Sequence, residues 1–499
     1  MKKPFIILLG LILVLVLCYI ALQRRGRSDF ADHSPDDELT LYCAAGLRNP
    51  VSKIIEQYSE ETGCTVNIIY NGSGALLSQI QLAQGDLYLP ANISYVRDAQ
   101  ELGLAEEETI PVAVLTAKII VSKNNTKIQC IDDLTKPGVR LSFANKSAAI
   151  GKFTREVLAE DGMLSKIETN ITVTKPTVNN IIEDVMLGSV DATIAWDAVA
   201  ANFPELRTIE VPIFTAKKRE ACVTLLTTSK NSAKALHLAR YIAAKDKGQM
   251  SFKAAGFATP DISDRWTETP ELLAFSGAML KPAIDKRIQE FEKREGCKVT
   301  TVYEGCGTLI SQMLAGAKPS FYFSCDKTYL DHAQDRFTEG TTVPPDEIIL
   351  LVPQSNPKQL VSLKDLTTKQ AKIAIASSTK YAFGAVTYKM LITNGVLQAL
   401  EQSNNSMVLD RKGDVLVAQM QAGALDAALL YRSHAMANPS LMEHCDIISI
   451  SRQDAITLQT FATANETPYP RQIQRLGNFL TNDDGKKNFL NHGFTWEKD

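Results

Sequence analysis

The stretch NPVSKIIEQYSEETGCTVNIIYNGSGALLSQI (residues 49–80) has a counterpart later in the chain, KPAIDKRIQEFEKREGCKVTTVYEGCGTLISQM (residues 281–313). In both stretches a proline opens an amphipathic helical pattern, a glycine (Gly63 or Gly296) ends it, and a β-rich run follows. A Gly-x-Gly turn then starts a second helical pattern. This alternation of strands and helices predicts an α/β fold with a parallel sheet covered by helices on both faces.

Three further pairs of blocks follow in the same order and with a nearly constant offset. These pairs are 87–100 with 321–334, 186–200 with 420–435, and 246–257 with 483–494. So many collinear matches indicate that the chain is a tandem duplication. We expect a first domain at 38–260, a polar, turn-rich linker at 261–270, and a second, diverged domain at 271–499.

The N-terminus has a pattern of its own. An apolar run from Pro4 to Leu22 lies between basic residues, and as a helix it would be about 28 Å long, close to the ~30 Å of a hydrocarbon core. The run lacks the A-x-A pattern of a cleaved signal peptide, and Cys18 lacks the small preceding residue of a lipoprotein signal. We therefore expect a membrane anchor at 1–23, followed by a linker at 24–37, although cleavage stays an alternative.

Composition and missing motifs set aside several classes of function. The net charge of −3 gives no indication of a nucleic-acid partner. The nine cysteines contain no C-x-x-C pair and the six histidines do not cluster with them, so neither a metal site nor a cofactor is predicted. Cys64 is expected to be a buried single thiol, with a disulfide to Cys43 left open. No G-x-S-x-G, H-E-x-x-H or P-loop motif indicates an enzyme.

Candidate binding residues lie at strand-to-helix junctions, where open parallel sheets bind ligands and helix N-termini present free N–H groups. In the first copy, CAAGLRNP contains Gly46 and NGSGALLS places Ser73 between two glycines. NKSAAIGKF contains Ser147 and Gly151, and in KPTVNNII the residue Thr177 suits an N-cap. One such junction is more often only a turn, but four in this order predict a ligand cleft.

With these junctions, the chain resembles the periplasmic molybdate-binding proteins of ABC importers, which have the type II periplasmic-binding-protein fold. The block GSVDATIAW (188–196) resembles that family's GEADAGIVY. The resemblance covers nearly all of the first copy and the second more weakly. It implies two tandem units outside the cytoplasm, each with two subdomains that close by a hinge around a cleft. It also implies a bound oxyanion, molybdate or tungstate first, and an ABC permease as partner.

The resemblance assigns binding positions to both copies. In the first they are Gly46, Leu47, Arg48, Ser73, Gly74, Ile150, Gly151, Val178 and Trp196. In the second they are Ala278, Cys306, Gly307, Phe383, Gly384, Gly413 and Tyr431. Gly46 lacks the hydroxyl of the family's serine, and Trp196 replaces its tyrosine. Because a thiol is a weak donor, Cys306 predicts poor oxyanion binding, or another ligand, in the second domain.

Two other functions remain open. The chain could be a receptor for another small anion, or a tethered sensor or scaffold whose second copy binds a partner protein. Several residues also have plain structural interpretations. Trp196 and Tyr431 could be buried aromatics that close a strand, Asp191 and Asp426 are expected to brace loops, and Arg48 could be solvated.

Overall fold

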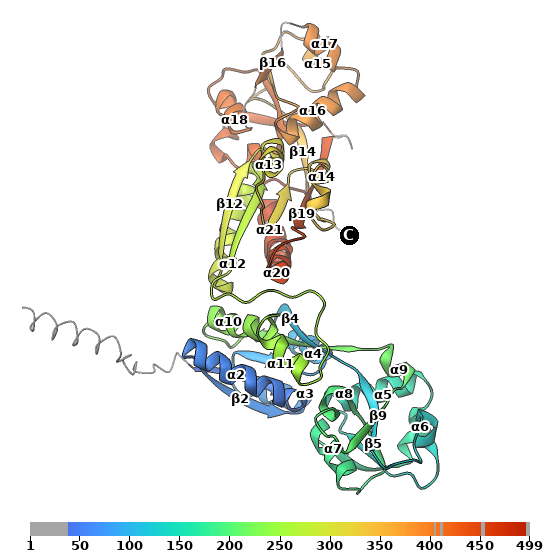
Figure 1. The fold of residues 1–499 in the computed structure, drawn as a ribbon. Coiled ribbons are helices and arrows are strands. Elements are labelled where there is room, and N and C mark those ends of the chain that lie inside the picture. The colour runs from blue at the N-terminus through green and yellow to red at the C-terminus, as the bar shows by residue number, and fades with distance from the viewer. Residues whose placement is uncertain (1–37, 404–405, 410–412, 451–454, 496–499) are drawn as a thin grey trace, which may run out of the picture.

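The computed structural model describes residues 38–403, 406–409, 413–450 and 455–495. The predicted anchor (1–23) and the linker after it (24–37) lie outside the described residues. Among the helices within these ranges, none combines the length and apolar character that a membrane span requires. Figure 1 shows the first repeat in blue to green and the second in yellow to red. Each repeat encloses a separate hydrophobic core.

The first subdomain of the first repeat is built on a five-stranded sheet in the order β2-β1-β3-β10-β4. Its strands are β1 (Glu38–Ala44), β2 (Thr65–Asn71), β3 (Leu87–Leu89), β4 (Ala105–Leu115) and β10 (Arg219–Leu226). Its helices are η2 (Ala45–Leu47), α2 (Arg48–Thr62), α3 (Ser73–Ile80), α4 (Ser94–Glu101), α10 (Ser232–Ala243) and α11 (Gly248–Ala254). Helical spacing places Val51, Ile54 and Tyr58 on one buried face of α2.

The second subdomain of this repeat has a five-stranded sheet in the order β7-β6-β8-β5-β9. Its strands are β5 (Ala117–Ser122), β6 (Leu141–Ala144), β7 (Ile171–Lys175), β8 (Ala192–Trp196) and β9 (Leu206–Ile209). Its helices are η3 (Ile131–Thr135), α5 (Ala149–Glu160), α6 (Leu164–Glu168), α7 (Val178–Met186), α8 (Asp197–Ala200) and α9 (Pro212–Thr215). The chain passes between the subdomains twice, at Thr116 and again between β9 and β10.

The second repeat has the same arrangement around one nine-stranded sheet. Its strands are β11 (Glu271–Gly277), β12 (Lys298–Glu304), β13 (Phe321–Ser324), β14 (Thr341–Pro353), β15 (Ile373–Ala376), β16 (Ser406–Leu409), β17 (Ala427–Tyr431), β18 (Cys445–Ser449) and β19 (Ile456–Thr463). Strand β14 pairs with β19 in its first half and with β17 and β18 in its second. It therefore takes the place that β4 and β5 share in the first repeat.

The helices of the second repeat follow the same order along the chain. They are η4 (Ala278–Leu280), α12 (Lys281–Glu295), α13 (Cys306–Leu314), α14 (Lys327–Asp331), η5 (Gln334–Arg336), α15 (Asp365–Thr368), α16 (Ala382–Thr393), α17 (Leu397–Gln402), α18 (Gly413–Gln421), α19 (Arg432–Met436), η6 (Pro439–Leu441), α20 (Pro470–Thr481) and α21 (Asp483–Asn491).

Strand register confirms the duplication residue by residue. The parallel pairing of β1 with β2 runs over seven residue pairs, starting at Glu38 and Thr65. The parallel pairing of β11 with β12 also runs over seven residue pairs, starting at Glu271 and Lys298. The glycines predicted to end the two long helices do so, with φ of 72° at Gly63 and 63° at Gly296. This left-handed conformation favours glycine.

Buried polar contacts join the two repeats, whose helices α10 and α12 pack together (Figure 1). Arg240 of α10 donates to the backbone carbonyl of Glu295, the last residue of α12. The fully buried Glu295 carboxylate pairs with Arg475 of α20 at 2.8 Å. From the linker, Asp264 accepts hydrogen bonds from the first N–H groups of α20, at 2.7 Å from Arg471 N. The linker is therefore bonded to the second repeat.

Candidate functional site

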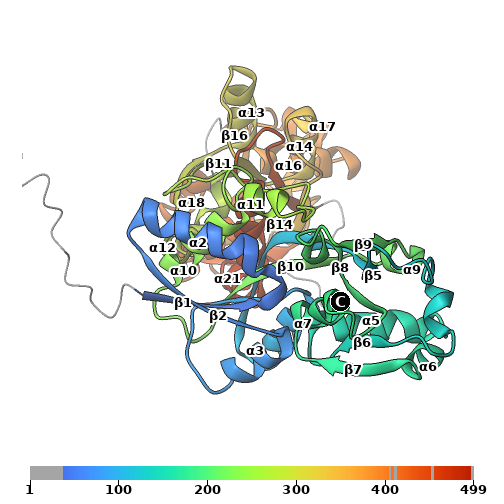
Figure 2. The same cartoon turned by 60° about the horizontal axis from the view of Figure 1, so that its bottom comes forward.

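In the first repeat, a small cavity lies between the two subdomains. We call it the first cleft, and it is lined by Ala44, Ala45, Gly46, Asn71, Gly72, Ser73, Ala91, Ala148, Ala149, Ile150, Thr177, Val178 and Trp196. Figure 2 shows α3 and α7 at this boundary between the subdomains. The enclosed volume is about 20 Å³, little more than one water molecule requires.

Three helices of eight or more residues begin at the first cleft. Helices α3 and α5 start after Gly72 and Ala148, neither of which caps its helix with a side chain. The positive ends of their dipoles therefore face the cleft without a side-chain cap, although one N–H group in the first turn of α3, that of Gly74, is bonded to Ser147 O. Helix α7 is capped by Thr177, as predicted. The Thr177 hydroxyl accepts a hydrogen bond from Asn180 N at 3.4 Å.

Ser73 is the hydroxyl that the first cleft offers to a ligand. Its side chain is only 1% exposed, and Oγ accepts a hydrogen bond from Ala91 N at 3.2 Å. Because a hydroxyl has one donor and two acceptor sites, the Ser73 proton is left for a second partner. The Tyr88 hydroxyl donates to the Ser73 carbonyl at 2.7 Å and so holds this residue at the start of α3.

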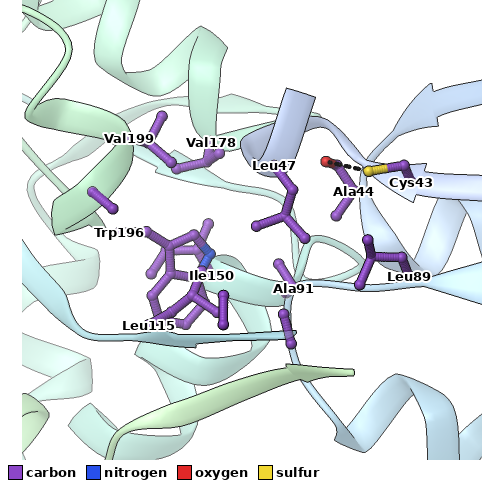
Figure 3. Close-up of a cluster of buried hydrophobic side chains, with 14 of the residues drawn as sticks. Cys43, Ala44, Leu47, Leu89, Ala91, Leu115, Ile150, Val178, Trp196 and Val199 are labelled. Atoms are coloured by element: carbon purple, nitrogen blue, oxygen red, sulfur yellow. Dashed lines mark hydrogen bonds between the residues drawn. The ribbon is translucent and has the colours of Figure 1, made fainter. Parts of the chain in front are cut away.

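The opposite wall of the first cleft is apolar. Figure 3 shows Ile150, Val178, Trp196 and Val199 converging there from α5, α7, β8 and α8. A Cβ atom on Gly46 would lie 2.8 Å from Val178 Cγ1, closer than atoms pack. The Val178 side chain therefore fills the space in which the resemblance places a serine hydroxyl.

Direct contacts hold the two subdomains together across the first cleft. Gly74 N donates to the carbonyl of Ser147 at 2.8 Å, and the Tyr95 hydroxyl donates to the same oxygen at 3.0 Å. A Cβ on Gly74 would lie 2.5 Å from that oxygen, and one on Gly72 would lie 2.8 Å from the Pro176 carbonyl. The glycines of the Gly-x-Gly turn are therefore needed for the close approach of the subdomains.

The structure brings five of the nine predicted residues of the first repeat to the cavity: Gly46, Ser73, Ile150, Val178 and Trp196. The other four lie elsewhere. Leu47 is fully buried in the core, and exposed Arg48 stacks on Tyr70 at 4.2 Å, so it points away from the ligand position. Gly74 makes the closing contact, and Gly151 packs against β6, where a Cβ would lie 2.0 Å from Asn145 O.

The second repeat has an equivalent cavity, the second cleft. It is lined by Ala278, Met279, Gly305, Cys306, Cys325, Tyr381, Ala382, Phe383, Gly413, Asp414, Tyr431 and His434. Gly307 and Gly384, also predicted, lie outside the lining. A Cβ on Gly307 would be 2.8 Å from Thr379 O, and one on Gly384 would be 2.3 Å from Ser377 O. Both therefore have the packing roles of Gly74 and Gly151.

The chemistry of the second cleft differs from that of the first. The rings of Phe383, Tyr431 and His434 lie 5.2 to 5.9 Å apart. Burial lowers the pKa of His434 to about 4, although Asp414 opposes this shift, so the imidazole is neutral near pH 7. Within the described residues, no hydrogen-bond partner is found for the buried Tyr431 hydroxyl or for His434 Nδ1. The second cleft thus offers thiols and aromatic rings.

Sequence reasoning missed Cys325, Asp414 and His434 in the second cleft and Ala91 in the first. Ala91 and Cys325 follow the short strands β3 and β13, so the ends of these strands were the available signal. His434 of α19 follows Tyr431, the residue that precedes this helix, by three positions. This spacing could have indicated that the two side chains share a face.

Other predicted structural roles are confirmed. Asp191 Oδ2 accepts from Arg140 N, and Asp426 Oδ2 accepts from Lys372 N, both at 2.8 Å, so each aspartate braces a loop. The eight cysteines within the described residues form no disulfide with one another, and Cys64 is a buried thiol, as predicted.

The model of a family described as bacterial extracellular solute-binding protein matches residues 39–258 and again 272–495. A Haemophilus influenzae protein named only as a binding protein is 32% identical over 162 residues, which is 32% of this chain and 65% of that protein. The molybdate-binding protein ModA of Mycobacterium tuberculosis is 26% identical over 180 residues, 34% of this chain and 67% of its own. Both relatives are thus matched over about two thirds of their length. The solved periplasmic molybdate-binding protein of Azotobacter vinelandii is 18% identical, covers 45% of this chain and 100% of its own, and has a TM-score of 0.40.

Proposed function

Because this chain belongs to the family of bacterial extracellular solute-binding proteins and contains the type II binding fold twice, we propose that it is a receptor that binds a small oxyanion in its first cleft and delivers it to an ABC permease. Molybdate and tungstate are the first candidates. The family is one of binding proteins rather than enzymes. The observation that carries the proposal is the meeting of three helix starts and the Ser73 hydroxyl in one cavity between hinged subdomains.

The chemistry of the first cleft suits an oxyanion. No charged side chain occurs among its lining residues, so the negative charge would be stabilised by N–H groups, helix dipoles and hydroxyls. Charge-assisted hydrogen bonds contribute about 1.5–3 kcal/mol each. Five of them would give roughly 8–15 kcal/mol, against a cost of at least about 4 kcal/mol for association. The difference of roughly 4–11 kcal/mol corresponds to dissociation constants from about millimolar to about 10 nM.

Hinge motion is part of this proposal. The cavity is small, so the proposed anion would be enclosed by a movement of the two subdomains. The two passages of the chain between the subdomains supply the hinge. In the closed receptor, the contact between Gly74 and Ser147 would bring together surfaces from both subdomains for the permease.

A thermal-unfolding assay on residues 38–499 tests the proposal. Molybdate and tungstate should raise the melting temperature, since a ligand at 100 times its Kd stabilises by about 2.7 kcal/mol, whereas sulfate should raise it much less. Ser73→Ala should weaken binding about tenfold or more, because a charge-assisted bond is lost. The matched variant Cys306→Ala alters the equivalent position of the second repeat and should leave this binding unchanged. Absence of a shift with every tetrahedral oxyanion would reject the proposal.

Two features support a separate role for the rest of the chain. We propose that residues 1–23 form a membrane anchor, which fractionation of cells with and without this segment would test.

The second repeat lacks two features of the first cleft. It has no counterpart of the Ser73 hydroxyl. It also lacks the ion pair between Lys152 and Asp98, which crosses the first cleft at 3.2 Å, because Ala385 and His332 occupy the equivalent positions. These losses favour a sensor or scaffold function for the second repeat. If purified permease retained its affinity for a chain with a disrupted second cleft, this role would be rejected.

A further inference from the structure

Three neighbouring positions of the first cleft are replaced together in the second. The equivalent pairs are Ala44 and Gly277, Ser73 and Cys306, and Ala91 and Cys325. The hydrogen bond between the last two positions is retained, because Cys325 N donates to Cys306 Sγ at 3.2 Å, as Ala91 N does to Ser73 Oγ. The change therefore places two thiols where the first cleft has one hydroxyl.

The three replacements fit each other sterically. The sulfur atoms of Cys306 and Cys325 lie 3.0 Å apart. A Cβ on Gly277 would lie 1.9 Å from the Sγ of Cys325 and 3.3 Å from that of Cys306. Alanine, which occupies this position in the first repeat, would thus collide with the sulfur pair. Glycine at 277 is what allows both thiols to share this space.

The two thiols differ in their tendency to ionise. Cys306 is the first residue of α13, where the helix dipole favours a thiolate. Burial raises its pKa, but hydrogen bonds from Cys325 oppose burial and leave the pKa of Cys306 below its usual value. The hydrogen bond with Cys306, together with burial, raises the pKa of Cys325. One thiol is therefore prepared to attack and the other to follow.

We propose that Cys306 and Cys325 form a reversible disulfide at the floor of the second cleft. The Cys306 thiolate attacks a disulfide of an oxidised small thiol or a dithiol oxidoreductase, and one sulfur of that oxidant leaves as a thiolate. Cys325, losing its proton, then attacks Cys306 Sγ and displaces the second sulfur. The two cysteines lose two electrons and two protons, and the oxidant disulfide becomes two thiols.

The disulfide would change the ligand chemistry of the second cleft without linking its two subdomains. Both cysteines belong to the same subdomain, Cys306 at the start of α13 and Cys325 directly after β13. Both thiols line the cleft and are buried, so an oxidant or reductant would reach them when the cleft opens locally. Oxidation removes both of these thiol donors from the lining and leaves an apolar bridge. The redox state would thus decide which ligand the second cleft accepts.

A metal site is less consistent with the geometry. In the part of the chain that the structure describes, no three His, Cys, Asp or Glu side chains are grouped as metal ligands. The 3.0 Å separation of the sulfur atoms instead leaves roughly 1 Å to an S–S bond, which small side-chain rotations can supply.

The test uses purified protein treated with either oxidised glutathione or a reducing agent, followed by alkylation and peptide mass spectrometry. Oxidation should link the peptides of Cys306 and Cys325, with a mass loss of about 2 Da and two fewer alkylated thiols. It should also raise the melting temperature by about 5–10 °C, since a short loop is closed. Reduction should reverse both changes.

Matched variants make the result specific. Cys306→Ser and Cys325→Ser should each abolish the linked peptide and the thermal shift, whereas Cys43→Ser, a buried thiol of the first repeat, should change neither. Gly277→Ala should lower the yield of the linked peptide. If both thiols remain alkylatable after oxidation, or if Cys306 links to another cysteine, the proposal is wrong.

Oxidation within the cell relies on the proposed location outside the cytoplasm, but the purified-protein test does not. Oxyanion binding to the first cleft should be the same in both redox states. Failure of the disulfide and failure of the proposed receptor function can therefore be told apart.

Discussion

Replacing Gly74 with alanine should keep the first cleft open while leaving its lining residues in place. Gly74 is not part of the cavity wall, but its N–H donates to Ser147 O at 2.8 Å across the cleft. An added Cβ would lie 2.5 Å from that oxygen and 3.1 Å from Tyr95 Cε1. Because a carbonyl oxygen of the backbone cannot move aside easily, the two subdomains would have to separate.

The magnitude follows from the cost of overpacking. One extra methyl group in a closely packed contact costs about 1–3 kcal/mol. The cost falls on the closed form alone, because an open cleft moves Ser147 away from residue 74. Since every 1.4 kcal/mol corresponds to about a tenfold change in a binding constant, Gly74→Ala should weaken oxyanion binding by about 5- to 150-fold.

Isothermal titration with molybdate would measure this loss, and small-angle scattering with and without the anion would report closure. Gly307→Ala is the matched control. It adds the same group to the Gly-x-Gly turn of the second repeat, 2.8 Å from Thr379 O, and should leave molybdate binding unchanged. Thermal unfolding without the anion should be nearly the same in both variants, because alanine is tolerated in a first helical turn.

Two outcomes would refute this reasoning. If Gly74→Ala bound molybdate as tightly as the parent protein, closure through this contact would not contribute to binding. If it lost stability in the absence of the anion to the same extent as it lost affinity, the contact would belong to the fold rather than to the closing motion.

Three further changes test the contacts around the cleft and the junction. Tyr95→Phe removes the 3.0 Å hydrogen bond to Ser147 O and should weaken oxyanion binding about 2- to 10-fold in the same titration. Glu295→Gln leaves the buried Arg475 without its carboxylate partner and should lower the free energy of unfolding by about 3–5 kcal/mol in urea; an unchanged value would mean that the junction is hydrated. Burial raises the pKa of Glu108 from 4.5 to about 7. The folded state therefore binds more protons than the unfolded state between these values, and stability should fall as the pH rises through this window. Glu108→Gln should flatten that dependence in unfolding curves, and an identical pH profile would contradict the assignment.

Much of the fold could be predicted because its signals are local. Helix-ending glycines such as Gly63, capping residues such as Thr177 and the apolar face of α2 depend on near neighbours in the chain. The duplication added long-range information, because each copy served as a check on the other. The matching strand registers of the two repeats agree with the duplication predicted from the sequence.

The candidate site was less predictable, because cavity walls depend on contacts between distant segments. Arg48 is near Gly46 in sequence, but its side chain stacks on Tyr70 and points away from the cleft. Val178 was predicted as a binding position, but its side chain fills the space beside Gly46. The partnership of Cys306 with Cys325 depends on space left by Gly277, which no local pattern in the sequence indicates.

The uninterrupted β14 has a mechanical consequence. In the first repeat, the corresponding path is divided between β4 and β5 at Thr116, so one residue can absorb a rotation there. In the second repeat, the 13-residue strand β14 runs through a shared sheet that extends into both subdomains, with one irregularity in its pairing between Val343 and Asp346. Bending it would break ladder hydrogen bonds. We therefore expect large opening and closing motions of the subdomains in the first repeat, and a comparatively rigid second repeat.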